Sequence, residues 1–201
     1  FAEDAVRDYR FTRQDQDDYA LRSLNRAVEA IKTGAFVKEI TPVVVSDRNG
    51  ETIVEIDEQP GNAKPDKIPS LRPAFVKDGT VTAANSSSIS DGAAALVMTR
   101  QSVAERLGLP IIARIVGTAG HAQEPPKFTS APVPAITKLL AKVGWTIEDV
   151  DLFEVNEAFA VVAMITQKEL NIPIEKLNVN GGATALGHPI GASGARIIAT
   201  L

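Results

Sequence analysis

The sequence predicts an α/β fold in which a largely parallel sheet is covered by helices. The main observation is that strand-like and helix-like segments alternate from Ile111 onward. Alternation of this kind is typical of parallel sheets. A second observation is a glycine-rich segment, residues 178–196, that directly follows one of the predicted strands. In open α/β sheets, ligand sites gather where the carboxyl ends of strands give way to loops.

The composition limits the class of protein. The 201 residues are 44% hydrophobic and 23% charged, as in an ordinary soluble globular protein, and they fit one large domain or parts of two. A net charge of -4 without a basic run gives no reason to expect a nucleic-acid partner. No apolar stretch is long enough to span a membrane, and no signal-peptide pattern opens the chain. The absence of cysteine excludes disulfides, thiolate metal sites and a cysteine nucleophile within these residues.

Both ends of the sequence are unusual. The first residue is Phe1 rather than methionine, and the helix predicted from Ser193 is followed by no glycine or proline that would stop it. We therefore expect the sequence to be part of a longer protein.

The clearest single element is a helix over Thr12–Thr33. Thr12 and Asp15 resemble a capping pair, and Gly34 is a natural stop. Apolar residues recur between them at helical spacing.

A hairpin and a loop follow this helix. Ile40–Val45 and Thr52–Ile56 are predicted strands around a turn at residues 47–50. Gln59–Pro73 is rich in proline and charge, which predicts a loop.

The middle of the chain is predicted as a strand, a turn and a short helix. Thr80–Ala84 is a predicted short strand and Asn85–Asp91 a serine-rich turn. Ala93–Met98 has the composition of a buried run, and Ser102–Leu107 a helix closed by Gly108.

The last ninety residues carry the alternation. The predicted strands are Ile111–Gly117, Val150–Val155 and Leu177–Asn180, and the predicted helices are Val133–Val143, Phe159–Leu170 and a last one from near Ser193.

His188 is the first candidate for chemistry. It lies among five glycines in the segment NVNGGATALGHPIGASGAR. Glycines allow sharp bends and a close approach of the backbone to a ligand, and an imidazole can change its charge near neutral pH. A neutral imidazole there could accept a proton from a nucleophile or donate to a developing oxyanion. The other histidine, His121, has no such setting and is interpreted as structural.

Asn156 has two interpretations of equal weight. It follows a predicted strand and precedes a helix, so it can simply cap that helix. It can also hold a water or a carbonyl group at the carboxyl end of the strand.

A nucleotide-binding interpretation of the glycines is weaker. Gly187, Gly191 and Gly194 do not form the dinucleotide pattern, and residues 182–188 lack the lysine of a phosphate loop.

Taken together, the motifs resemble those of the thiolase family. EVNEAFA at residues 154–160 and the glycine-rich segment at 178–196 resemble two motifs of the C-terminal half of thiolases. LRPAF at residues 71–75 and GTVTAANSSSISDGAAA at 79–95 resemble the end of the substrate-binding loop domain. The resemblance covers essentially the whole chain.

This resemblance implies a thiolase-like fold with layers α-β-α-β-α, of which the chain holds the loop domain and part of the second half. Residues 1–88 would be a partial loop domain, residues 89–110 the end of the N-terminal half, and residues 111–201 a truncated C-terminal half. Thiolases assemble as dimers or tetramers, so a homodimer or homotetramer is expected.

The resemblance also assigns roles to residues. His188 matches the histidine that activates the nucleophilic cysteine and helps to form an oxyanion hole, and Asn156 matches the asparagine that holds a water there. The remaining matches are to positions that line or contact coenzyme A: Ser87, Ala83, Leu71, Phe75, Ala158 and Phe159. No metal and no cofactor beyond the coenzyme A thioester substrate is expected.

The activity implied is acyl transfer through an acyl-cysteine. The enzyme would be an acetyl-CoA acetyltransferase that condenses two acetyl-CoA into acetoacetyl-CoA or catalyses the reverse thiolysis. The alternatives are a degradative 3-ketoacyl-CoA thiolase with longer acyl chains and a non-catalytic relative that binds coenzyme A or lipid. Thiolases use two cysteines, which would both lie outside this sequence, so these residues alone are expected to be inactive. The compartment, cytoplasm or an organelle matrix, stays open.

Overall fold

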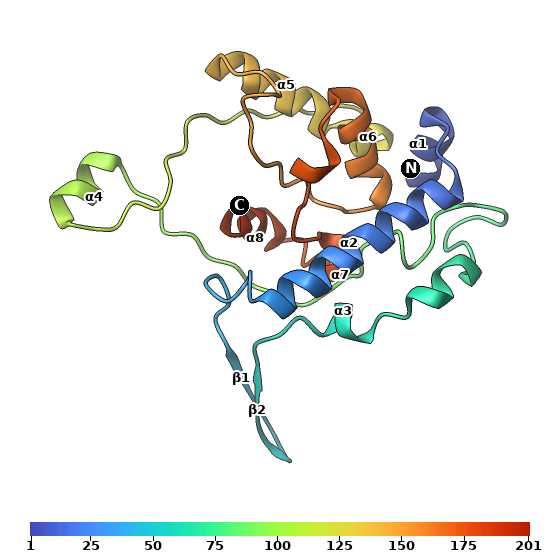
Figure 1. The fold of residues 1–201 in the computed structure, drawn as a ribbon, viewed down its shortest axis with the longest axis horizontal. Coiled ribbons are helices and arrows are strands. Elements are labelled where there is room, and N and C mark those ends of the chain that lie inside the picture. Colours follow the sequence, from blue (N-terminus) through green and yellow to red (C-terminus); the bar gives the residue numbers. More distant parts are fainter.

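The computed structural model describes residues 1–201, and its longest element is helix α2, Arg13–Thr33. The sequence prediction for this helix is confirmed. The Thr12 side chain accepts from the Asp15 backbone N–H, the Asp15 carboxylate accepts from the Thr12 N–H, and Gly34 ends the helix in the left-handed conformation. Figure 1 shows α2 running across the molecule between α6 and α3.

Most of the other elements are short helices. The remaining α-helices are α1 (Ala2–Tyr9), α3 (Glu58–Asn62), α4 (Gln101–Leu107), α5 (Pro132–Val143), α6 (Ala160–Leu170), α7 (Ala183–Leu186) and α8 (Ser193–Thr200). The 3-10 helices are η1 (Pro65–Ser70), η2 (Pro125–Ser130) and η3 (Ile174–Lys176). The predicted helices correspond to α4, α5, α6 and α8 with bounds shifted by about one residue. The predicted loop 59–73 is wrong in part, because α3 and η1 form in it.

The only regular sheet is the predicted hairpin. Strands β1 (Val43–Asp47) and β2 (Gly50–Val54) pair antiparallel, with Val43 opposite Val54 and Asp47 opposite Gly50. Every residue of both strands is exposed, and the hairpin projects away from the rest of the chain (Figure 1).

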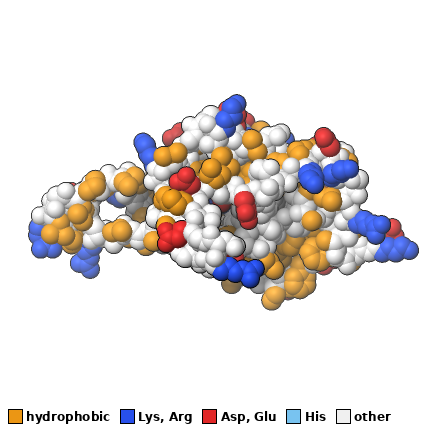
Figure 2. Space-filling model, turned by 90° about the horizontal axis from the view of Figure 1, so that it is seen from below, with side chains coloured by type: hydrophobic (Ala, Val, Ile, Leu, Met, Phe, Trp, Pro, Cys, Tyr) orange, Lys and Arg blue, Asp and Glu red, His pale blue; other side chains and the backbone are white.

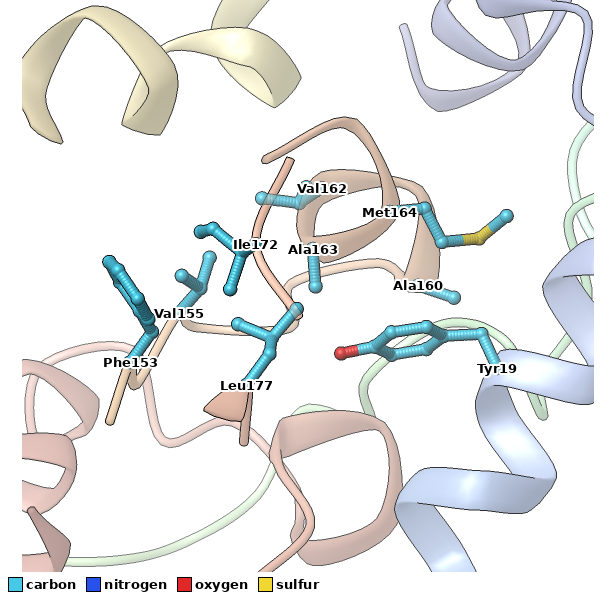
Figure 3. Packing of buried hydrophobic residues seen from close by; sticks show 9 residues of the cluster. All are labelled: Tyr19, Phe153, Val155, Ala160, Val162, Ala163, Met164, Ile172 and Leu177. Atoms are coloured by element: carbon cyan, nitrogen blue, oxygen red, sulfur yellow. The ribbon is translucent and has the colours of Figure 1, made fainter. Parts of the chain in front are cut away.

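The core forms around α6. Seven of its eleven residues, from Ala160 to Thr166, are buried. A first hydrophobic cluster joins α6 to Phe153, to Leu177 and to Tyr19, which lies on α2. Figure 3 shows the Tyr19 ring reaching from α2 toward Leu177. A second cluster places α6 against α1 and Val81. Helices α1 and α2, from the N-terminal part of the chain, therefore hold the segment that carries NEAF, residues 156–159 of the EVNEAFA motif.

The predicted parallel sheet is represented by a single contact. Phe153 and Leu177 form an isolated parallel bridge, in which the Phe153 N–H donates to Lys176 and the Asn178 N–H donates to Phe153. The segments 150–155 and 177–180 therefore lie side by side and parallel, as predicted, but neither forms a strand of a ladder.

Three other sequence predictions are wrong in this structure. Thr80–Ala84 forms bends, because the Asn85 side chain accepts from the Thr82 N–H and folds the backbone into a turn. Ile111–Gly117 pairs with no strand, and the Ile112 side chain is 99% exposed. Ala93–Met98, predicted as buried, is exposed at nearly every position. These apolar runs lack a neighbouring segment of the chain that would supply backbone partners and cover their side chains.

The exposed segments 93–98 and 111–117, together with α4 between them, form an arm. Figure 1 shows α4 at the end of two long connections, and Figure 2 shows hydrophobic side chains along this arm. None of the helices combines the length and the apolar character needed to cross a bilayer.

Candidate active site

Asn156 and His188, which are 32 residues apart, meet at one point. Asn156 lies just before α6, and His188 follows α7. The Asn156 Nδ2 atom lies 3.2 Å from the His188 Nε2 atom. Gly187, with a φ of 92°, turns the chain out of α7, and the His188 backbone N–H donates to the Ser88 carbonyl at 3.0 Å. The structure therefore brings together the two residues singled out for chemistry.

Ser193 determines where the proton of the neutral imidazole lies. The Ser193 hydroxyl donates to the Pro189 carbonyl oxygen at 3.1 Å, and the Ser193 oxygen lies 2.6 Å from His188 Nδ1. Because the serine proton is used toward Pro189, the serine oxygen accepts from Nδ1–H. The other ring nitrogen, Nε2, then carries the lone pair and accepts from the Asn156 amide. This arrangement leaves the basic nitrogen on the side of Asn156.

The imidazole is held neutral and remains accessible. Burial, and second the positive charge of Arg196 on α8, lower the pKa of His188 below its usual value. The ring is only half-buried. An open hollow of about 460 Å³, lined by residues 90–94 and 189–192, begins at Pro189, the residue after His188. A neutral, reachable imidazole can act as a general base.

Asn156 has an unused acceptor. Its Oδ1 atom is buried and has no hydrogen-bond partner within the chain. Buried polar atoms are nearly always paired, so an unpaired one needs an explanation. A ligand group or a water that donates to Oδ1 would complete the hydrogen bonding of this side chain.

Ser87 lies against the start of α6. Its hydroxyl donates to the Ala158 carbonyl oxygen at 2.8 Å, and its backbone N–H donates to the same oxygen at 3.2 Å. Ser86 and Phe159 form an antiparallel bridge one position along. Three of the residues matched to coenzyme A contacts, Ser87, Ala158 and Phe159, therefore lie together, and in this structure the Ser87 hydroxyl is used within the chain.

Aromatic rings gather on Phe159. The Phe75 ring meets it edge-on with centroids 6.1 Å apart, and the Phe128 ring lies at 6.2 Å. Phe75 is one of the residues matched to coenzyme A contacts, whereas Phe128 was not predicted. Two further matched residues are not linked to the catalytic pair: Leu71 is half-buried, Ala83 is exposed, and neither donates or accepts a hydrogen bond with Asn156 or His188.

Sequence reasoning also missed Ser193 and Glu157. Ser193 stands five residues after His188, where α8 begins, and its place within the glycine-rich motif was the available signal. Glu157 stands inside the NEAF motif beside Asn156, and it is completely buried.

Glu154, at the other end of the EVNEAFA motif, is half-buried, and its Oε2 atom is buried without a hydrogen-bond partner. Burial raises its pKa to about 7; Arg196 lowers the pKa, while Glu157 and Glu39 raise it further. The folded state thus holds this proton more tightly than the unfolded state does, so the free energy of unfolding falls as the pH rises from about 4.5 to about 7.

We expect Glu154→Gln to remove this pH dependence. The neutral amide avoids the buried charge, so the variant should be more stable than the wild type at pH 8 by up to roughly 3 kcal/mol, at 1.36 kcal/mol per pKa unit. At pH 4 the two proteins should differ much less. Denaturant unfolding of both proteins at the two pH values measures the difference, and an equal gain at both would contradict the role of the charge.

Comparison with known proteins defines the family. The family model described as "Thiolase, N-terminal domain" matches residues 1–102, and the model described as "Thiolase, C-terminal domain" matches residues 109–201. The chain therefore belongs to the thiolase family. This finding confirms the resemblance seen in the motifs.

Individual relatives agree with this assignment. Acetyl-CoA acetyltransferase 2 of Arabidopsis thaliana is 52% identical over all of the chain and 50% of its own length. The crystal structure of the Bacillus anthracis acetyl-CoA acetyltransferase superposes with a TM-score of 0.96 and 45% identity, over 100% of the chain and 51% of that protein. A thiolase from Ascaris suum, solved in complex with coenzyme A, gives a TM-score of 0.90 and 42% identity over the same shares. The chain has the thiolase fold over its length, and it spans about half the length of these relatives.

Proposed function

We propose that the protein carrying this chain is an acyltransferase of the thiolase type, with acetyl-CoA acetyltransferase activity. The observation that carries the proposal is the contact between Asn156 and the basic nitrogen of His188, 3.2 Å apart at the meeting point of the two family motifs. The names of the relatives at 52% and 45% identity support the short-chain activity.

In the proposed reaction His188 activates a sulfur nucleophile. The nucleophilic cysteine comes from outside these 201 residues, since the sequence contains none. His188 Nε2 accepts the thiol proton, and the thiolate attacks the acetyl carbonyl of acetoacetyl-CoA. The bond between the two acetyl units breaks, which leaves an acetyl-cysteine, and the carbanion of the departing unit takes a proton from the second cysteine, also outside these residues, to give acetyl-CoA. The thiol of a second coenzyme A then takes the acetyl group from the cysteine, and the cysteine is restored.

Negative charge develops on the thioester oxygen of the departing acetyl-CoA when the bond between the two acetyl units breaks. The imidazolium formed at His188 and a water held at Asn156 are the proposed donors to that oxygen. Donors that are already in place favour the transition state more than the ground state. The unpaired Asn156 Oδ1 is the proposed position that accepts from this water.

Coenzyme A is the proposed substrate carrier. The residues proposed to contact it are Ser87, Ala83, Leu71, Phe75, Ala158 and Phe159. The clustering of Ser87, Ala158 and the Phe75–Phe159 ring pair supports one continuous surface, and the relative solved with coenzyme A supports this choice of ligand. We also propose the division into residues 1–88, 89–110 and 111–201, and a homodimer or homotetramer.

The test is thiolysis of acetoacetyl-CoA by the longest protein encoded by the reading frame that contains this chain. Two acetyl-CoA per turnover and an acetylated cysteine detected by mass spectrometry would support the proposal. Binding of coenzyme A without turnover would instead indicate a non-catalytic relative. A preference for 3-ketoacyl-CoA substrates with long acyl chains would indicate a degradative thiolase. The 201-residue chain alone is expected to be inactive in the same assay.

The lowered pKa of His188 predicts the pH dependence of this activity. Because the base must be neutral, kcat/KM should fall only below the pKa of His188, which burial and Arg196 keep under its usual value of 6.5. A pH profile of kcat/KM therefore should show its acidic limb below pH 6.5. An acidic limb well above that pH would contradict the assignment of His188 as the base.

A further inference from the structure

Glu157 is a completely buried carboxylate with no cation beside it. None of the ion pairs of the chain involves Glu157. Its charge is instead met by five hydrogen bonds. The donors are Tyr19 OH and Asn178 Nδ2 to Oε1, both at 2.9 Å, and Ser23 Oγ, Thr184 Oγ1 and Thr184 N to Oε2, at 2.7, 2.7 and 3.1 Å. Such complete pairing is what a buried charge requires.

Two of these donors cannot change role, and they face different oxygens. The backbone N–H of Thr184 is always a donor, and it points at Oε2. The Asn178 amide is oriented by the Val155 N–H, which donates to Asn178 Oδ1 at 2.8 Å, so its NH2 group faces Oε1. Both oxygens of Glu157 must therefore accept, which a carboxylate does and a glutamine side chain cannot.

The five donors come from three separate parts of the fold. Tyr19 and Ser23 belong to α2, Asn178 follows the bridge at Leu177, and Thr184 lies in α7. Ser23 extends the link, because its oxygen also accepts from the Gly182 N–H at 2.9 Å. Burial and the Glu157 carboxylate raise the pKa of Tyr19 well above its usual value, so its hydroxyl remains a donor.

The absence of a side chain at Gly182 allows this close approach. A Cβ atom there would lie 2.4 Å from the Glu157 carboxyl carbon. The carboxylate therefore packs directly on the backbone that begins α7.

Glu157 is connected to both members of the catalytic pair. Asn156 precedes it in the chain. His188 follows Thr184 by four residues, with α7 as the connection, and the Gly187 N–H donates to Ala183 at 2.9 Å within that turn. A shift of the carboxylate would therefore move the segment that carries Asn156 relative to the segment that carries His188.

We propose that Glu157 is a positioning residue that sets the distance between Asn156 and His188 by joining the NEAF segment to the start of α7. The inference rests on the proposed thiolase function, and it adds a third residue to that site. Glu157 does not touch the reacting atoms. It acts through the backbone of Asn156 and through α7.

The test is Glu157→Gln in the full-length protein, assayed by thiolysis of acetoacetyl-CoA. The NH2 group of the glutamine would face Asn178 Nδ2 in one orientation and the Thr184 N–H in the other, so a donor would meet a donor in both. We expect kcat to fall about 100-fold, since displacements near 1 Å at remote positions have effects of that size, and KM to stay near the wild-type value. Loss of the Asn156 contact should also move the acidic limb of the pH profile upward, because the donated N–H stabilises the neutral imidazole. Arg196 is the charged group that acts on His188, and it is unchanged in this variant.

Tyr19→Phe is the matched control. It removes one of the two donors to Oε1 and, unlike Glu157→Gln, places no donor against another donor. The kcat and the pH profile should therefore stay close to those of the wild type. A Glu157→Gln variant that loses activity only in proportion to its unfolded fraction, with an unchanged pH profile, would overturn the proposal. Wild-type kcat in the folded variant would also overturn it.

Ser23→Ala covers the case in which Glu157→Gln does not fold. This variant cuts the link from Glu157 to the Gly182 N–H and leaves four donors on the carboxylate. A smaller fall in kcat with the same upward shift of the acidic limb is expected, and a folded Ser23→Ala protein with wild-type kinetics would overturn the proposal. The wild-type protein and His188→Ala separate the two hypotheses. No thiolysis by the wild-type protein would refute the thiolase function itself, whereas normal thiolysis by Glu157→Gln beside its loss in His188→Ala refutes only the role of Glu157.

Discussion

Replacing His188 with alanine is expected to lower kcat for thiolysis of acetoacetyl-CoA by about 10²–10⁴-fold, the usual contribution of a general base. The reason is the arrangement of the ring. Ser193 holds the proton on Nδ1 and leaves Nε2 to accept one, while burial and Arg196 keep the imidazole neutral. Without this ring no base accepts the thiol proton, and the negative thioester oxygen loses one of its hydrogen-bond donors. Steady-state kinetics of the full-length protein measure the loss.

His121→Ala is the natural control, because it removes the only other histidine. His121 lies beside Gln123 and Lys138, far along the chain from the site motifs, and it makes hydrogen bonds with both. Its replacement should leave kcat and KM nearly unchanged. A His188→Ala protein that folds and retains more than about a tenth of the wild-type kcat would contradict the role of His188 as the base.

The sequence predicted best the features that depend on neighbouring residues. Helix α2 is determined locally, since Thr12, Asp15 and Gly34 close its ends and its apolar residues recur at helical spacing. The hairpin was found for the same reason, because its turn residues and its two strands are adjacent. A capping box or a tight turn is complete within a few residues, so the sequence alone contains the whole interaction.

The strand predictions were wrong in part because a strand needs pairing partners that the local sequence does not specify. The composition of Ile111–Gly117 is that of a strand, yet no other segment pairs with it. By contrast, Phe153 finds Leu177, and the predicted parallel neighbours do lie side by side. The apolar pattern correctly indicated which residues prefer burial or pairing. It could not indicate whether these residues contain the segment that covers them.

The sequence predicted the two residues proposed to do the chemistry, but not the residues that hold them in position. His188 and Asn156 were identified from their motifs, and they meet as expected. Ser193 and Glu157 were not, because their roles depend on contacts across the fold: Glu157 accepts from Tyr19, 138 residues earlier in the chain. A buried glutamate in a motif is indistinguishable in sequence from an exposed one, and only its set of donors reveals its role.

Gly181→Ala is expected to destabilise the protein by about 2 to 4 kcal/mol. Gly181 has a φ of 81°, in the left-handed region that costs a residue with a Cβ roughly 1–2 kcal/mol. An added Cβ would also lie 2.5 Å from the Ser23 carbonyl oxygen and 2.8 Å from the Ala27 nitrogen, both backbone atoms of α2. A helix backbone cannot yield as the end of a flexible side chain can, so the turn that leads to α7 must move instead.

Gly194→Ala is the matched control for this substitution. Gly194 lies in α8, its φ is not positive, and a Cβ there would meet open space, so alanine should be neutral or slightly stabilising. Denaturant unfolding of both variants measures the difference. Because the displaced turn carries Gly182 and Thr184, the part of Gly181→Ala that stays folded should also lose kcat, as Glu157→Gln does. Stability within 0.5 kcal/mol of the wild type would mean that the turn is free to move away from α2, and the rigid link between α2 and the histidine segment would then be wrong.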